Sequence, residues 1–286
     1  MTDAAVAPLL VSTPQSQAVT TEQPLVRYVL IGVAVVFLVV FLFLPLASVI
    51  VEALRSGLGT YFASITEPDA VSAIKLTLLI AAIAVPANVV FGLAASWAIA
   101  KFDFPGKSLL NSLIDLPFSV SPVISGLIYV LLFGAQGYLG PYLQGENIQI
   151  IFALPGMVLA TIFVSLPLLA RELVPVLQEI GVEQEQAAWT LGASGLQTFR
   201  RITLPAIRWA LAYGVILTLA RALGEFGAVA VVSGGLVGKT QTLTLYVQQE
   251  FQNFDPVGAY AAAFVLALIA IVVLIAINVI RPKETS

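Results

Sequence analysis

Arg221 and Glu225 are ionisable side chains inside a long apolar run of the sequence, and they stand four residues apart. An ionised side chain near the bilayer centre costs about 2.5–3.5 kcal/mol on insertion scales, so such residues face a bundle interior, a partner or a water path. A spacing of four residues puts both on one helical face, where they can pair. Two interpretations stay open: Arg221 lines an anion path and Glu225 orients it, or the two form a structural ion pair.

A second polar pattern consists of Asn111, Asp115 and Ser119, which recur every four residues at the start of another apolar run. On a helix this spacing makes one polar stripe. With Ser121 and the kink expected at Pro122, the stripe predicts residues that line a pore. Polar packing between helices is the alternative interpretation.

The segment SGGLVGKT, residues 233–240, is similar to a phosphate-binding loop but lacks its first glycine, because Ser233 stands at that position. The chain also contains no His and no Cys. The commonest general base, the commonest metal ligand and any thiolate chemistry are therefore excluded. We predict that this chain is not an enzyme, with no catalytic residue, no metal site, no cofactor of its own and no nucleic-acid partner.

The elements that must position these side chains are helices built for lipid. Hydrophobic residues make up 59% of the chain and charged residues only 10%, against about 25% charged residues in soluble domains. Apolar runs of about 20 residues can cross the hydrocarbon core as helices. The predicted fold class is an all-α membrane protein with six transmembrane helices, the third of them interrupted by proline, at residues 28–51, 76–100, 114–133, 150–170, 210–232 and 258–280.

Lys and Arg residues predict the orientation, because they gather in the cytoplasmic loops of membrane proteins. With a cytoplasmic N-terminus, nine of them fall in inside segments and three in outside segments. Both termini are therefore predicted to be cytoplasmic. Residues 1–25 are polar and have no basic residue, which is typical of a disordered tail. Residues 26–286 form the predicted transmembrane domain.

The longest predicted cytoplasmic segment, residues 171–208, contains a polar module with the pattern helix, tight turn, helix. Gly192 can end the first helix in a left-handed turn without a steric penalty. Ser194 and Gln197 form a capping-box pattern for the second helix, which we expect to stop at Pro205. The module suits docking of a cytoplasmic partner. An amphipathic hairpin that lies on the membrane surface is the alternative.

The stretch QAAWTLGASGLQTFRRITLP within this module resembles the EAA loop of ABC importer permeases, whose pattern is roughly E-A-A-x-x-x-G, nine residues, then I-x-L-P. Gln186 stands where the family has Glu, with Glu185 just before it. In the family this loop forms coupling helices that insert into a cleft of the ATPase subunit. The resemblance implies that the docking residues are Glu185, Gln186, Ala187, Ala188, Gly192, Ala193, Ser194, Leu204 and Pro205.

Segments 102–127, 169–177 and 221–234 extend the resemblance to sulfate and thiosulfate permeases, especially the CysW type. It implies a type I ABC importer fold in the cell inner membrane and a path formed with a second, CysT-like permease. The other implied partners are two copies of an ATPase that binds ATP and Mg, and an extracytoplasmic sulfate-binding protein. Residues predicted to line the path are Arg221, Glu225, Asp115, Ser119 and Ser121.

Other functional classes stay open at this point. Molybdate and tungstate permeases share parts of the same segments. A stand-alone anion channel or carrier could use the charged pair as a gate, but it gives no account of the helix-turn-helix module. Carriers often contain internal repeats, and no persuasive repeat is present.

Overall fold

The computed structural model describes residues 24–280, which contain helices and no strand. Within them, five helices are long and apolar enough to cross a membrane, or six if a bent pair counts as one span. The elements are α1 (Pro24–Leu38), the π turn η1 (Val39–Phe43), α2 (Leu44–Leu54), α3 (Leu58–Thr66), α4 (Pro68–Lys101), α5 (Lys107–Ser119), α6 (Pro122–Phe133), α7 (Gly140–Gly145), α8 (Leu154–Ile180), α9 (Glu183–Thr190), α10 (Gly195–Thr198), the π turn η2 (Phe199–Thr203), α11 (Leu204–Leu223), α12 (Gly227–Ser233), α13 (Leu243–Gln252) and α14 (Pro256–Ile280).

The chain divides into two compact units, residues 1–48 and 49–286. The described part of the first unit, residues 24–48, belongs to the apolar helix Leu25–Leu54, which contains the predicted span 28–51 and ends in the second unit. The predicted disordered tail, residues 1–25, lies outside the described residues apart from its last two. The second unit contains every residue that the sequence assigns to a functional site.

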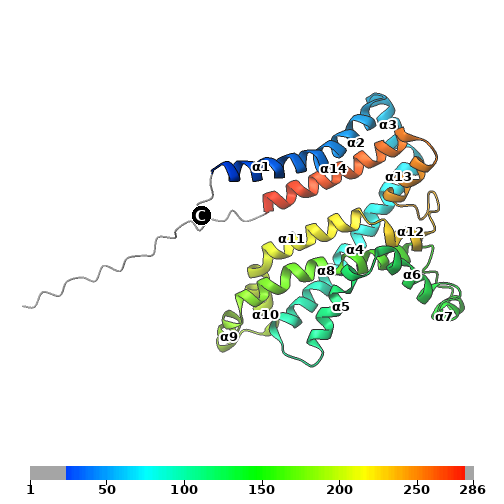
Figure 1. Cartoon of the computed structure of the whole chain (residues 1–286). Coiled ribbons are helices and arrows are strands. Elements are labelled where there is room, and N and C mark those ends of the chain that lie inside the picture. Colours follow the sequence, from blue (N-terminus) through cyan, green and yellow to red (C-terminus); the bar gives the residue numbers. More distant parts are fainter. Residues whose placement is uncertain (1–23, 281–286) are drawn as a thin grey trace, which may run out of the picture. The chain divides into compact units, whose positions relative to one another are not determined.

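The centre of the second unit is a layer in which α4, α8 and α11 pack side by side (Figure 1). Leu169 of α8 is fully buried between two glycines of the neighbouring helices. A Cβ atom at Gly92 of α4 would lie 2.8 Å from Leu169, and one at Gly214 of α11 would lie 2.6 Å from it. Small residues let membrane helices approach closely. This contact therefore sets the separation of the three long helices.

Helix bounds differ from the predicted spans because the predictions ended at the first charged residue. A helix can continue past a charge wherever one of its faces stays apolar. Helix α4 begins at Pro68, eight residues before the predicted 76, and α8 runs to Ile180, ten residues beyond the predicted 170. Leu173 and Leu177 are buried on the extended part of α8. Arg171, assigned to the cytoplasmic segment 171–208, therefore lies inside a helix.

Both π turns, η1 and η2, are followed by a Leu-Pro pair. A proline ring in an α-helix collides with the carbonyl four residues earlier. In η2 the Leu204 N–H instead reaches back five residues to the Phe199 carbonyl, and this wider turn lets the helix continue. The prediction that Pro205 stops the second helix of the module was wrong. Residues Gly195–Leu223 form one helix of 29 residues.

The predicted third span, 114–133, is two helices, α5 and α6, which meet at an angle of 111°. Pro122 has no N–H to donate and favours an extended conformation at the residue before it. Ser121 has a ψ of 137° and ends the straight course of α5. Prolines were expected to interrupt this span, but the chain turns there by more than a right angle.

The predicted fifth span, 210–232, also breaks, because α11 ends at Leu223 and α12 begins at Gly227. The short helix α12 packs against α6. A Cβ atom at Gly126 of α6 would lie 2.8 Å from the Ala228 carbonyl oxygen, and one at Gly227 would lie 2.9 Å from Pro122. The two helix breaks are thus held against each other by glycine contacts.

We expect Gly126→Leu to push α6 away from α12 and to destabilise the protein by about 1–3 kcal/mol, the usual range for overpacking. Thermal unfolding of the detergent-purified protein measures the effect. Gly59→Leu in α3 is the matched control, because a Cβ atom there meets nothing within 4 Å. Equal stability of the two variants would show that the close contact between α6 and α12 is unimportant.

Candidate functional site

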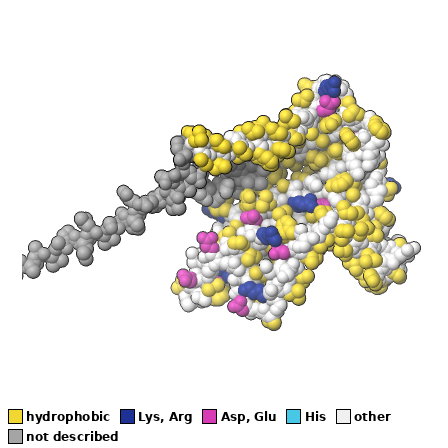
Figure 2. Space-filling model, in the orientation of Figure 1, with side chains coloured by type: hydrophobic (Ala, Val, Ile, Leu, Met, Phe, Trp, Pro, Cys, Tyr) yellow, Lys and Arg dark blue, Asp and Glu magenta, His cyan; other side chains and the backbone are white. Residues whose placement is uncertain are grey.

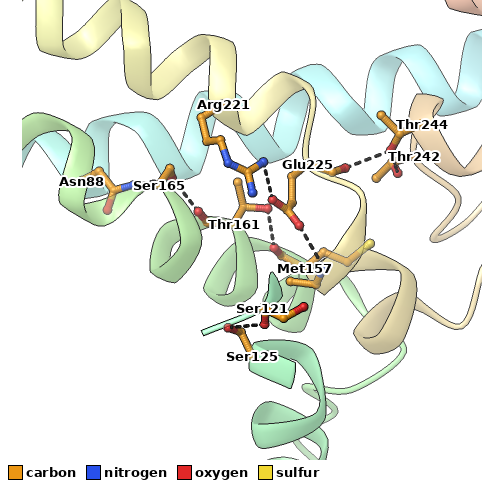
Figure 3. A network of polar contacts seen from close by, with 11 residues as sticks. Asn88, Ser121, Ser125, Met157, Thr161, Ser165, Arg221, Glu225, Thr242 and Thr244 are labelled. Carbon is orange, nitrogen blue, oxygen red and sulfur yellow. Dashed lines mark hydrogen bonds and ion pairs between the residues drawn. The ribbon is translucent and has the colours of Figure 1, made fainter. Parts of the chain in front are cut away.

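Arg221 and Glu225 form an ion pair, with 2.6 Å between Nη1 and Oε2 (Figure 3). The pairing confirms the prediction, but the pair does not share one helical face. Arg221 lies in the last turn of α11, whereas Glu225 lies in the break that follows. The Glu225 side chain is 2% exposed and the Arg221 side chain 34%. The cation is therefore the accessible member of the pair.

Glu225 is fixed from several sides. Its Oε1 accepts a hydrogen bond from the Ala228 N–H (2.8 Å) at the start of α12, and its backbone carbonyl accepts one from the Thr244 hydroxyl (2.9 Å). These bonds replace helix hydrogen bonds that are lost at the break. Glu225 thereby joins α11, α12 and α13, and it holds Arg221 from one side.

A pocket of about 260 Å³ lies between Arg221 and the break that separates α5 from α6. Ser119 and Ser121 line it, together with Val164 and Leu168 of α8. Three of the predicted path residues, Arg221, Ser119 and Ser121, thus meet at one pocket. A guanidinium beside hydroxyl groups offers several hydrogen-bond donors, which suits an oxyanion.

Asp115 does not line this pocket. It accepts a hydrogen bond from Arg171 of α8, with 2.9 Å between Nε and Oδ1. The Arg171 guanidinium also lies over the Phe118 ring, 4.3 Å from its centroid. Figure 2 shows basic and acidic side chains lying next to one another on the face formed by α5, α8 and α11. The sequence analysis missed Arg171, although it follows Val164 and Leu168 at helical spacing.

The turn of the polar module has the predicted geometry. Gly192 has a φ of +83°, and the Ala193 N–H donates to the Ala188 carbonyl at 3.0 Å, as in a Schellman motif. Ser194 and Gln197 form the predicted capping box. A Cβ atom at Gly192 would meet nothing within 4 Å. The glycine is therefore needed for its backbone conformation and not for packing within the chain.

Glu185 is buried at the base of the module, where its carboxylate accepts from the Thr203 hydroxyl (2.6 Å) and lies 3.4 Å from the Lys101 ammonium. Lys101 also donates to the Gly181 carbonyl. This cluster joins the ends of α4 and α8 to α9 and η2. The sequence analysis missed Lys101, because the pair joins positions far apart in the chain. The carboxylate that departs from the family pattern by one position thus faces inward.

The other side of the module is exposed. Gln186 and Ala187 are accessible, as is Gly192 at the turn. Three large apolar side chains project beside them: Trp189, Leu191 and Leu196 are 52%, 89% and 68% exposed. Leu204 is half-buried and Pro205 exposed at the start of α11. Trp189 was not among the predicted docking residues, although it lies within the EAA-like stretch.

The loop 233–240 is closed by its own groups. The Thr240 hydroxyl donates to the Ser233 carbonyl at 2.6 Å, and the Leu236 carbonyl accepts from the N–H groups of Lys239 and Thr240. A phosphate-binding loop would direct such N–H groups at a ligand. These donors instead face the Leu236 carbonyl.

The family described as binding-protein-dependent transport system inner membrane component matches residues 88–286. The chain belongs to this family. The sulfate transport system permease protein CysW of Synechocystis sp. is 50% identical over 258 residues, which cover 90% of this chain and 94% of that protein. CysT of Salmonella typhimurium is 36% identical over 267 residues, 93% of this chain and 96% of that protein.

This permease also shares its fold with a chain of the bacterial alginate ABC transporter solved in complex with an alginate pentasaccharide-bound periplasmic protein. The TM-score is 0.76 at 18% identity, over 92% of the permease and 96% of that chain. These findings confirm the predicted all-α ABC importer permease fold. They also confirm the resemblance to CysW-type proteins. The permease is a multi-pass inner membrane subunit and not the enzyme that hydrolyses ATP.

We expect Lys101→Met to destabilise the permease by about 3–5 kcal/mol, because it leaves the Glu185 carboxylate buried and unpaired. The double variant Lys101→Met with Glu185→Leu should lose less stability than Lys101→Met alone, since no unpaired charge is then buried. Lys107→Met is the matched control, because Lys107 forms an exposed ion pair with Asp103 and such pairs contribute about 0–1 kcal/mol. Thermal unfolding compares the variants. Additive losses in the double variant would contradict a direct Lys101–Glu185 coupling.

Proposed function

We propose that this chain is the permease subunit of an ATP-driven importer of sulfate and thiosulfate. The observation that carries the proposal is the 50% sequence identity to a CysW sulfate permease, which extends over 90% of this chain and 94% of that protein. The further similarity to a CysT protein supports a heterodimer, in which a second, CysT-like permease completes the path. No ATP is bound by this chain in the proposal. Two copies of a cytoplasmic ATPase, with ATP and Mg, supply the energy.

The Arg221 pocket supports an anion path. Its guanidinium is partly accessible while its counter-charge on Glu225 is buried, so an anion meets the positive group first. Ser119 and Ser121 add hydroxyl donors at the helix break. Broken helices that line a substrate site near the bilayer midplane are a common device in transporters. Arg221 binds the oxyanion in this proposal, and Glu225 positions Arg221.

The exposed side of the polar module supports docking of the ATPase. Trp189, Leu191 and Leu196 expose large apolar surfaces beside a turn that Gly192 fixes. Buried aromatic and aliphatic anchors supply most of the binding energy in protein interfaces. We propose that this tip inserts into a cleft of the ATPase while the buried Glu185 holds the base of the module. The segments on the opposite side of the membrane would meet the sulfate-binding protein, with both termini in the cytoplasm.

The proposal is tested by uptake of labelled sulfate in cells that lack the gene, with the gene restored as wild type, Arg221→Ala or Arg221→Lys. Wild type should restore uptake, Arg221→Ala should reduce it at least tenfold, and Arg221→Lys should keep part of it because the charge remains. Excess molybdate serves as a competitor.

Co-purification of the second permease and the ATPase with each variant is the control for assembly. Uptake that does not depend on the gene would refute the sulfate importer. Uptake that molybdate suppresses would favour a molybdate or tungstate permease. Normal uptake by Arg221→Ala would remove Arg221 from the path while leaving the family unchanged.

Gly192→Val should weaken capture of the ATPase at least tenfold, because a β-branched residue is strained at a φ of +83°. The measurement is retention of the purified ATPase on the immobilised permease complex. Gly195→Val is the matched control, since Gly195 is equally open but has no positive φ. If both variants retain the ATPase as wild type does, the turn at Gly192 is not needed for docking.

A further inference from the structure

Arg171 and Asp115 form an accessible ion pair that the proposed binding pocket does not use. We propose that Arg171 is a second oxyanion-binding site on the path. It lies one helical turn from the Arg221 pocket, on the side toward α9. Asp115 pairs with its guanidinium until a tetrahedral oxyanion displaces the carboxylate. The proposal rests on the proposed function and names one more residue of the same path.

Two helices place the pair next to the pocket. On α8, Val164 and Leu168 line the pocket. Arg171 lies seven residues after Val164 and three after Leu168, so it is on the same helical face. On α5, Ser119 lines the pocket and Asp115 lies four residues earlier. Both helices therefore put the pair about one turn, roughly 5 Å, from the pocket along their axes.

Phe118 connects the two sites. It lines the Arg221 pocket, and its ring lies under the Arg171 guanidinium at 4.3 Å. A guanidinium stacked on an aromatic ring keeps the donors at its edge free. An anion that leaves the pocket along this face passes Phe118 and then meets Arg171.

The donors of Arg171 are only partly used. Asp115 accepts from Nε, and no hydrogen bond from either Nη atom is found among residues 24–280. The Arg171 side chain is 56% exposed and that of Asp115 38%. A guanidinium has five N–H donors and can hold an oxyanion through two of them at once. The exposed Nη edge is therefore available to a ligand.

Packing between α5 and α8 does not need this ion pair. Ile114 of α5 and Ala170 of α8 are both buried in one apolar cluster with Ala95 and Ile99 of α4. Exposed ion pairs contribute little to stability. The Lys101–Glu185 pair shows the contrast, since its side chains are only 4% and 8% exposed. The exposure of the Arg171 pair suits a group that exchanges partners.

Asp115 gives the site a suitable affinity. A path conducts only if each site binds the ion well enough to receive it and weakly enough to release it. Without Asp115, Arg171 would still receive a divalent anion but would release it more slowly. A carboxylate that competes for the same guanidinium repels the anion and restores the resting pair after it leaves. The ligands that this site would take are small divalent oxyanions such as sulfate and thiosulfate.

The test is sulfate uptake by the complete transporter in proteoliposomes, with four variants. Arg171→Gln should reduce uptake at least tenfold, and Arg171→Lys should keep part of it. Asp115→Asn should keep at least about half, because the cation remains. The charge swap, Asp115→Arg with Arg171→Asp, should stay as low as Arg171→Gln, because the cation then projects from α5.

A purely structural ion pair predicts another pattern. Asp115→Asn would then be as harmful as Arg171→Gln, and the charge swap would restore uptake. Either result, or normal uptake by Arg171→Gln, overturns the proposal. Lys107→Gln, at the exposed Asp103–Lys107 pair of α5, is the matched control and should be neutral. A wild-type transporter without sulfate uptake would refute the proposed function, and this site with it, whereas active wild type and active Arg171→Gln would refute this site alone.

Discussion

Backbone polar groups inside a membrane must find partners within the protein, and this constraint governs the centre of the permease. Two of the predicted spans are interrupted, near Ser121 and at Glu225, and each break removes helical hydrogen bonds. The Glu225 carboxylate and carbonyl satisfy groups on α12 and α13. Close glycine contacts between α6 and α12 hold the two breaks against each other. The same residues that make the breaks tolerable also bring Arg221 to a pocket.

The Arg221–Glu225 ion pair and the polar module follow one rule, in which a buried carboxylate fixes the neighbouring parts. Glu225 is fixed so that Arg221 can remain partly accessible. Glu185 is fixed by Lys101 and Thr203 so that Trp189, Leu191 and the Gly192 turn can project. In both places the acidic residue is buried and fixed, and its exposed neighbour is the group to which the proposed function assigns a ligand or a partner.

Local signals could be predicted from the sequence, and contacts between distant residues could not. The left-handed turn at Gly192, the Ser194–Gln197 capping box and the Arg221–Glu225 pair each depend on residues within four positions of one another. Arg171–Asp115 and Lys101–Glu185 join distant residues, which only the tertiary packing brings together, α5 with α8 in the first pair and α4 with α9 in the second. The π turn η2 was missed because proline normally ends a helix. The end of α8 was missed because the predicted span stopped before Arg171, whereas a charged residue does not end a helix.

The long helix Gly195–Leu223, which includes the π turn η2, has a mechanical consequence. Its 29 residues extend about 43 Å at 1.5 Å per residue. It begins next to the capped turn of the polar module and has Arg221 in its last turn. The π turn η2 near its start is followed by an unbroken α-helix from Leu204 to Leu223, so a movement of this helix at one end also displaces its other end. A displacement of the polar module would therefore move the Arg221 guanidinium at the far end of the helix.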